Sequence, residues 1–330
     1  MGSRNRLEGL EIRRAHAADR AQVLLLMQSS LGWLADSEHA AFFSWKHDAN
    51  PFGPSPAWVA VDGEEVVGFR TFLKWEFLDG DRVLPAVRAV DTATRPDHRG
   101  RGIFSALTLH ALAELEREGV GFVFNTPNAS SRPGYLRMGW RQLGRLPARW
   151  RPRSPAGLLR AARARVPADL WSVATGAGRP ADEALADPGP IAEILAATPH
   201  SPGLRTNRTP AFLRWRYAGF TPLAYRVTQL GPDLDDGFAV FRLRRRGPAT
   251  EATVCDVVRP PGGAAGSDGR LLREILRRSR ADYTLRLGWS GRSDIVMPRQ
   301  GPLLACRALG PGEPPPLRRW QLRMGDIELF

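Results

Sequence analysis

Cysteine, lysine and long apolar segments are scarce in this sequence. The scarcity of cysteine and of apolar segments each excludes a class of protein. Cys255 and Cys306 are its two cysteines, and no cysteine or histidine spacing is typical of a zinc or iron–sulfur site. No metal is therefore expected. The two thiols can form a disulfide, although a cytosolic chain more often keeps such groups reduced and buried.

Long apolar segments are missing as well. No stretch approaches the roughly 18 uncharged apolar residues that a membrane-spanning helix needs. The longest apolar run near the start, residues 23–27, lies within an amphipathic pattern and does not resemble a signal peptide. We therefore expect a cytoplasmic chain with no membrane contact.

The positive charge comes almost entirely from arginine. Only Lys46 and Lys74 are lysines among the 47 basic residues, and the net charge is +13. The arginines are scattered and are not interleaved with aromatic residues, so nucleic acid is not the expected partner. Attraction to an acidic or phosphorylated ligand is favoured instead.

The length of 330 residues fits two domains of about 150 residues each. Apolar periodicity and turn residues define the elements of the first part. Strands are predicted at 10–13, 57–61, 65–77, 82–94 and 121–125, and helices at 17–31, 102–118 and 130–138. This order predicts a mixed α/β (α+β) domain, in which an antiparallel meander leads into one parallel crossover.

The second part of the sequence repeats features of the first in the same order. The offsets between the paired segments lie between 164 and 170 residues. The pairs are 43–47 with 212–217, 68–72 with 237–241, 89–91 with 254–256, and 95–96 with 259–260. We interpret the repeats as a duplicated domain, with a crossover helix at 271–278 and a strand at 283–287 in the second copy. The predicted division is residues 1–150, a basic connector at 151–168, and residues 169–330.

The segment Arg99-Gly100-Arg101-Gly102-Ile103-Phe104 carries the clearest chemical signal. A strand ends near Thr94, Pro96 prevents its continuation, and two glycines allow a tight turn before a helix. The free N–H groups at such a helix start favour a phosphate or pyrophosphate. An ordinary turn with two glycines is the alternative, but the proline, the arginines and the strand–helix context together argue against it. The second copy has only the glycine run 261–266 here, so we expect it to be degenerate.

This segment resembles the signature of the GNAT acetyltransferase superfamily, Arg/Gln-x-x-Gly-x-Gly/Ala. Arg99 and Gly102 match, whereas Phe104 replaces the usual small residue, as is common in the tandem-domain branch of the superfamily. A second family motif matches Asn128, Ser131, Tyr135, Gly139 and Trp140 without a gap. The resemblance implies tandem GNAT-like folds, with an active N-terminal domain and a degenerate C-terminal one.

The resemblance also implies a binding site for acetyl-CoA or another acyl-CoA. The backbone of Thr92, Ala93 and Thr94 would pair with the pantetheine arm, and Asn128 would contact that arm near the thioester. The pyrophosphate would be held by Arg99 and by the amides of Gly100, Arg101, Gly102, Ile103, Phe104 and Ser105. Tyr135 would be the general acid, with a core tyrosine packed on Trp140 as the alternative.

The general base and the acceptor are less well defined by the sequence. Asp91 and Glu76 are candidate bases, although each can equally be a solvated or paired carboxylate. Some tandem-domain relatives place a C-terminal carboxylate in the acceptor site, which makes Phe330 a third candidate. The acceptor is expected to be a small-molecule or peptide amine. The pocket for this amine would be lined by Trp33, Phe43, Trp45 and Trp75. Alternatively, these side chains belong to a hydrophobic core.

Three functions compete at this point. The first is an acetyl-CoA-dependent N-acetyltransferase, and the second is a non-catalytic acyl-CoA-binding or regulatory module. The third is a peptidyltransferase that uses charged transfer RNA. A sensor needs no proton donor such as Tyr135, and a peptidyltransferase needs no pyrophosphate site, so the first function is favoured.

Overall fold

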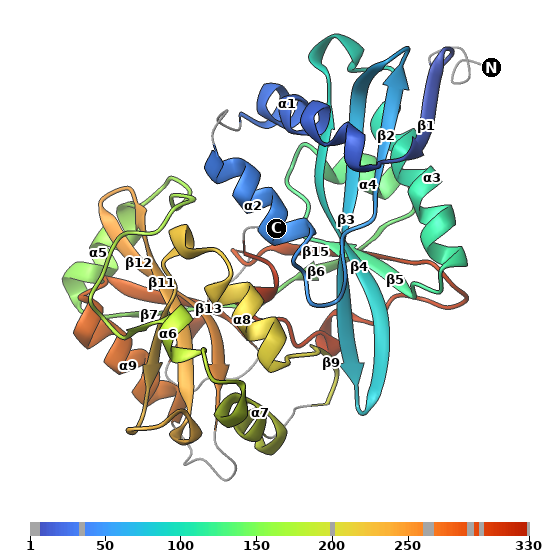
Figure 1. Ribbon diagram of the computed structural model, residues 1–330. Coiled ribbons are helices and arrows are strands. Elements are labelled where there is room, and N and C mark those ends of the chain that lie inside the picture. The colour runs from blue at the N-terminus through green and yellow to red at the C-terminus, as the bar shows by residue number, and fades with distance from the viewer. Residues whose placement is uncertain are drawn as a thin grey trace.

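The computed structural model describes residues 7–32, 37–198, 202–259, 267–288, 294–296 and 300–328. These residues form two mixed β-sheets with helices on their faces (Figure 1). The predicted mixed α/β fold is therefore confirmed. Within the described ranges, no helix has the length and apolar character to cross a membrane.

The first sheet has the strand order β1-β2-β3-β4-β5-β15-β6, and β9 pairs with the far end of β3. Tight turns at Gly63 and Gly80, both with positive φ, connect β2 to β3 and β3 to β4. The strands are β1 (Leu10–Arg14), β2 (Ala57–Asp62), β3 (Glu65–Asp79), β4 (Arg82–Thr94), β5 (Phe122–Asn125), β6 (Arg141–Arg145), β9 (Leu204–Thr206) and β15 (Leu303–Ala308).

The two central strands of the first sheet separate at one end. β4 runs parallel to β5 only from Ala86 to Arg88. Beyond Arg88, β4 continues to Thr94, whereas β5 ends at Asn125. The backbone of the last residues of β4 therefore has no partner strand on the β5 side, and this edge is open to a ligand.

Helices cover both faces of the first sheet (Figure 1). On one face, α1 (Arg20–Leu31) packs Val23 and Met27 near Phe69. On the other face, α3 (Ile103–Arg117) packs Ile103 and Leu107 near Phe72. The short helix α4 (Arg132–Arg137) follows β5. These helices and strands match the predicted elements, with ends that differ by one or two residues in most cases.

The helix α2 (Ser37–His47) was not predicted. Its apolar residues do not lie on one face, because α2 is enclosed between the first sheet and the second half of the chain. Phe42, Phe43 and Trp45 are buried, and so are the polar side chains of Lys46 and His47. A helix buried on several sides lacks the amphipathic period that reveals surface helices.

The second sheet has the order β14-β7-β13-β12-β11-β10-β8, and β12 runs parallel to β13 from Glu251 to Thr253. Its strands are β7 (Ala148–Pro152), β8 (Arg179–Pro180), β10 (Arg226–Gln229), β11 (Phe238–Arg246), β12 (Ala249–Val258), β13 (Tyr283–Leu287) and β14 (Ile295–Val296). Its helices are α5 (Pro155–Arg163), α6 (Ala181–Ala184), α7 (Pro188–Ala197), α8 (Pro210–Ala218) and α9 (Ser267–Ser279). The helix α9 joins the parallel pair β12 and β13, as α3 joins β4 and β5.

Each sheet contains a strand from the other half of the chain. β15, from the end of the chain, lies between β5 and β6 in the first sheet, and β7 pairs with β13 in the second sheet. The sheets therefore do not divide the chain at residue 150, where the sequence places a boundary. The expected connector at 151–168 also contributes to the second sheet, because it includes the end of β7 and the helix α5 that packs on β12 and β13.

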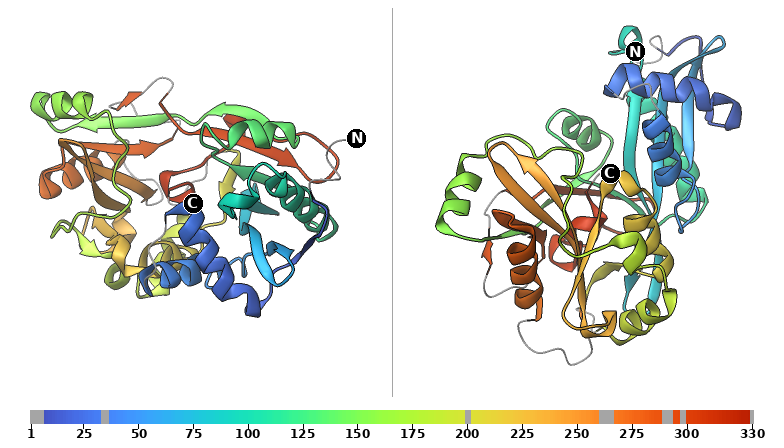
Figure 2. Two further views of the ribbon diagram at one scale, coloured as in Figure 1. Left: turned by 90° about the horizontal axis from the view of Figure 1, so that it is seen from above. Right: turned by 60° about the vertical axis from the view of Figure 1, so that its left-hand side comes forward.

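The C-terminal tail, residues 321–328, lies between the two sheets (Figure 2). Buried arginines from both halves of the chain bind it. Arg88 on β4 donates to the backbone carbonyls of Asp326 and Ile327. Arg216 on α8 donates to the carbonyl of Gly325 over 2.8 Å, and Arg242 on β11 pairs with Glu328. The tail thus fixes the sheets relative to each other.

Candidate functional site

The turn between β4 and α3 has the geometry that the sequence predicts. Gly100 and Gly102 both adopt positive φ, at 78° and 89°, where other residues are strained. The helix α3 begins at Ile103, and no side chain caps its first turn. The first amides of α3 are therefore available to an anion, and the helix dipole favours negative charge at this end.

A cavity of about 390 Å³, which we call the β4–α3 cavity, lies beside this turn. It brings together the end of β4, the start of α3 and the start of α4. Its lining residues are Ser30, Thr92, Ala93, Thr94, Arg99, Phe104, Ser130, Ser131, Gly134 and Arg137. Five of them, Thr92, Ala93, Thr94, Arg99 and Phe104, are predicted cofactor residues.

Two exposed arginines give this cavity its charge. Arg99 follows β4 and Arg137 ends α4, and neither side chain is paired with another residue that the structure describes. Arg99 was predicted from the sequence, whereas Arg137 was not, because it occupies a variable position of the second matched motif. Unpaired guanidinium groups beside free helix amides suit a ligand that carries phosphates.

The other predicted cofactor residues do not line the cavity. The guanidinium of Arg101 lies 3.6 Å from Asp62, and Ile103 is buried in the core beneath α3. Asn128 accepts hydrogen bonds from Ser130 and Ser131 and so stabilises the turn into α4. The side chain of Ser105 also lies outside the lining, so any role of Gly100, Gly102 and Ser105 is through their backbone.

Tyr135 lies between two other aromatic rings. Its ring centroid is 5.4 Å from that of Phe104, with the rings almost perpendicular, and 5.0 Å from that of Trp140. The side chain is 4% exposed, and its hydroxyl makes no hydrogen bond to a described residue. The packing on Trp140 agrees with a core role, while contact with the cavity-lining Phe104 keeps Tyr135 beside the candidate site.

Arg70, on β3, is a site residue that the sequence did not reveal. It is fully buried, and its guanidinium carbon lies 5.6 Å from the ring of Tyr135 and 5.7 Å from that of Phe104. Its Nη1 donates to the carbonyl of Val90 over 2.9 Å, where β4 contains a bulge opposite β3. This contact fixes the backbone of β4 next to the cavity.

Asp91 is a paired carboxylate. Its Oδ2 is 2.8 Å from Lys46 Nζ and 2.8 Å from His47 Nε2, and both partners come from the unpredicted α2. Burial alone would raise the pKa of Asp91, but Lys46 and His47 outweigh burial and hold it well below its usual range. Burial also lowers the pKa of Lys46 and of His47. A carboxylate held in this way is a weak proton acceptor, so the structure argues against Asp91 as the base.

The other residues predicted as a base or as the acceptor pocket lie in different surroundings. Glu76 accepts a hydrogen bond from Asn207 over 2.9 Å and is thus also paired. Phe43, Trp45 and Trp75 are buried in the hydrophobic cores, as the alternative interpretation predicts. Trp33, Phe330 and the glycine run 261–266 lie outside the described residues. No cluster of three or more potential metal ligands occurs in the described part of the chain.

Comparison with known proteins agrees with this geometry. Residues 11–143 match a family model described as an acetyltransferase (GNAT) domain. This segment contains the open edge of β4, the start of α3 and all of α4. No curated protein sequence matches the chain significantly.

Solved structures resemble the chain over most of its length. One is a probable N-acyltransferase of unknown function from Enterococcus faecalis V583, with a TM-score of 0.63 and 13% identity, covering 91% of this chain and 73% of that one. Another is a GCN5-related N-acetyltransferase from Anabaena variabilis ATCC 29413, with a TM-score of 0.60, 14% identity and the same coverages. A third, from Kribbella flavida, has a TM-score of 0.59, 17% identity, and coverages of 91% and 71%. The fold is therefore that of GNAT acyltransferase structures, over both sheets.

Proposed function

We propose that this chain is an acetyl-CoA-dependent N-acetyltransferase that transfers an acetyl or other acyl group to a primary amine of a small molecule or peptide. The observation that carries this proposal is the β4–α3 cavity. An uncapped helix start and an open strand edge meet there, with two arginines that have no partner among the described residues. The family match over residues 11–143 supports the same reaction class.

The residues of the cavity fit the parts of an acyl-CoA. The pyrophosphate would lie at the first amides of α3, with Arg99 and Arg137 beside it. The backbone of Thr92, Ala93 and Thr94 would bind the pantetheine arm as an added strand, because β5 ends before it can cover this edge. The co-substrate supplies the activated thioester, and the protein orients it next to the bulge of β4.

Transfer needs two proton movements. The amine nitrogen attacks the thioester carbon, the carbon–sulfur bond breaks, and the departing thiolate takes a proton. Tyr135 is our candidate donor, since it lies beside the cavity and its hydroxyl has no partner among the described residues. A strand N–H near Thr92 would stabilise the oxyanion, and Arg70 would hold that strand through the Val90 carbonyl.

The acceptor loses a proton to a base, and the C-terminal carboxylate is our candidate. Arg88 holds Ile327 near the point where β4 and β5 separate, because the same guanidinium contacts Ile327 and Thr126, which follows β5. We assign Asp91 a positioning role on β4, held by Lys46 and His47. The second sheet would be a degenerate copy that supports the tail.

Thiol release with acetyl-CoA across a panel of amines tests the proposal. The full chain should release thiol in an acceptor-dependent manner. Removal of Leu329 and Phe330 should lower turnover without changing acetyl-CoA binding, and Tyr135→Phe should act in the same way. Tight acetyl-CoA binding with no thiol release for any amine would instead support the non-catalytic acyl-CoA-binding module.

A further inference from the structure

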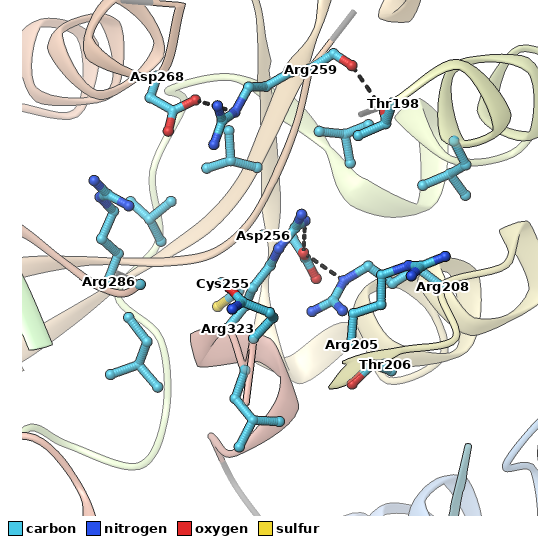
Figure 3. Close-up of a pocket in the computed structure, with 18 of the residues that line it drawn as sticks. Thr198, Arg205, Thr206, Arg208, Cys255, Asp256, Arg259, Asp268, Arg286 and Arg323 are labelled. Carbon is cyan, nitrogen blue, oxygen red and sulfur yellow. Dashed lines mark hydrogen bonds and ion pairs between the residues drawn. The ribbon is translucent and has the colours of Figure 1, made fainter. Parts of the chain in front are cut away.

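A second cavity, of about 310 Å³, lies at the carboxyl end of β12 (Figure 3). We call it the β12 cavity. Pairing between β12 and β13 ends at Thr253 and Leu285, and the cavity is lined by the residues that follow on both strands. It therefore occupies in the second sheet the place that the β4–α3 cavity occupies in the first. Neither matched motif includes any of its residues.

Arginine dominates the lining of the β12 cavity. Its arginines are Arg205, Arg208, Arg259, Arg286 and Arg323. Four of them have acidic partners: Arg208 and Arg323 share Asp256, Arg259 binds Asp268, and Arg286 binds Asp294.

Arg205 is different, because its half-buried side chain has no hydrogen bond or ion pair to another residue that the structure describes. Figure 3 shows Arg205 beside Arg208. Among the described residues, none compensates the charge of Arg205, which an anionic ligand would neutralise.

The start of α9 is less suited to a pyrophosphate than the start of α3. Asp268 lies in the first turn of α9 and pairs with Arg259 over 2.8 Å, so a carboxylate already occupies the surroundings of the helix start. The volume is at the lower limit of small-molecule sites, which span about 300–1,000 Å³. The carboxylate of Asp268 opposes a pyrophosphate at the start of α9, and the volume accommodates a compact ligand.

We propose that the β12 cavity binds a small phosphate-bearing metabolite, with the phosphate against Arg205 and Arg323. Arg205 supplies the unpaired charge. Arg323 uses Nη1 for Asp256 and retains other N–H donors on a side chain that is 33% exposed. Two guanidinium groups around one anion suit phosphate, which accepts several hydrogen bonds and carries more than one negative charge.

Binding at this site would act on the C-terminal tail. Arg323 belongs to the tail, and its partner Asp256 also binds Arg208. Arg208 in turn binds the carboxylate of Asp326, whose backbone carbonyl accepts from Arg88 on β4. A phosphate that holds Arg323 would therefore stabilise the tail against β4. The β12 cavity is thus an effector site, and its existence does not depend on the proposed acyl transfer.

Calorimetric titration of the full chain with inorganic phosphate and glycerol 3-phosphate tests this proposal at low ionic strength. The wild type should show two classes of site, one in each cavity. Arg205→Gln should weaken one class about tenfold or more, the loss expected for a charge-assisted hydrogen bond. Arg99→Gln should weaken the other class and should also weaken coenzyme A binding.

The controls are Arg205→Lys, circular dichroism and titration with acetate. Arg205→Lys, which keeps the charge, should retain part of the binding, and circular dichroism should show that both Arg205 variants fold. The proposal is overturned if Arg205→Gln leaves phosphate binding unchanged or if Arg99→Gln removes all of it. Equally tight binding of acetate at the Arg205-dependent site would overturn the assignment of phosphate.

Discussion

Trp45 and Trp215 each donate the indole N–H to the backbone carbonyl of the other, over 2.6 and 2.7 Å. Their rings stack with centroids 5.5 Å apart. The two residues are 170 positions apart and occupy the same place in the repeated aromatic segments. The reciprocal contact therefore relates α2 and α8 by a local two-fold symmetry at the junction of the two halves.

The same relationship extends to the neighbouring residues. His47 binds Asp91 over 2.8 Å, and at the matching positions Tyr217 donates to Asp256 over 2.5 Å. In both halves, the residue two positions after the tryptophan thus binds the aspartate of the central strand. These contacts support the predicted duplication. They also indicate a structural role for the His47–Asp91 pair, since the pair recurs where no arginine–glycine segment exists.

Trp45→Phe and Trp215→Phe should destabilise the protein by similar amounts. Each removes one buried N–H donor and leaves a carbonyl without its partner, which costs about 1–3 kcal/mol. Urea denaturation measures the change. Trp140→Phe is the matched control, because the buried Trp140 indole N–H has no partner among the described residues. Equal losses in all three variants would show that the reciprocal bonds contribute nothing beyond ring volume.

The stability of the protein should depend on pH in two windows set by His47 and Asp91. Burial lowers the pKa of His47 in the folded state, so the unfolded chain binds its proton first, and stability falls as pH drops below about 6.5. The lowered pKa of Asp91 adds stability that is present above about pH 4 and is lost as pH falls further.

Denaturation curves at several pH values separate the two windows. His47→Gln should flatten the stability profile between about pH 6.5 and pH 5, and Asp91→Asn should flatten it below about pH 4. Asp91→Asn should also destabilise the protein at neutral pH, because it leaves Lys46 buried without its carboxylate. An unchanged slope in the upper window for His47→Gln would refute the assignment.

Arg88→Gln should release the C-terminal tail. The substitution removes charge-assisted hydrogen bonds to the carbonyls of Asp326 and Ile327, each worth about 1.5–3 kcal/mol. Carboxypeptidase digestion followed by mass spectrometry measures the exposure of residues 324–328. The tail should resist digestion in the wild type and be trimmed in the variant. Equal trimming rates would show that Arg88 does not hold the tail.

Tyr135→Phe should lower kcat by about 10²–10⁴-fold, the usual contribution of a general acid. The phenylalanine ring keeps the contacts with Phe104 and Trp140, so stability and acetyl-CoA affinity should change little. Stopped-flow thiol release and calorimetry measure the two effects separately. A variant with full turnover would leave Tyr135 as a core residue.

Local sequence patterns predicted the hairpins and helices of the first sheet, because turns, caps and apolar periods are determined by adjacent residues. Gly63, Gly80 and Gly102 mark the ends of elements in both the sequence and the structure. The strand exchange could not be predicted in this way. The pairing of β15 with β5 joins residues about 180 positions apart, and nothing in either segment specifies the partner.

The sequence predicted only those parts of the candidate site whose backbone geometry is set by adjacent residues. The β4 end and the α3 start were found through Pro96, the two glycines and Arg99. Arg70 and the partners of Asp91 were missed, because their roles arise from burial and cross-strand contacts. Only Lys46 could have been singled out from the sequence, because it is one of two lysines in an arginine-rich chain.

The start of α3 and the arginines beside it should bind an acyl-CoA. Calorimetric titration of acetyl-CoA into the wild type, Arg99→Gln, Arg137→Gln and Arg82→Gln measures this binding. Arg82 is exposed at the far end of β4 and serves as the matched control. We expect binding at one site per chain, weakened about tenfold or more by Arg99→Gln and Arg137→Gln and unchanged by Arg82→Gln. Absence of binding to the wild type, or equal affinity in all four proteins, would overturn the proposed acyl-CoA site.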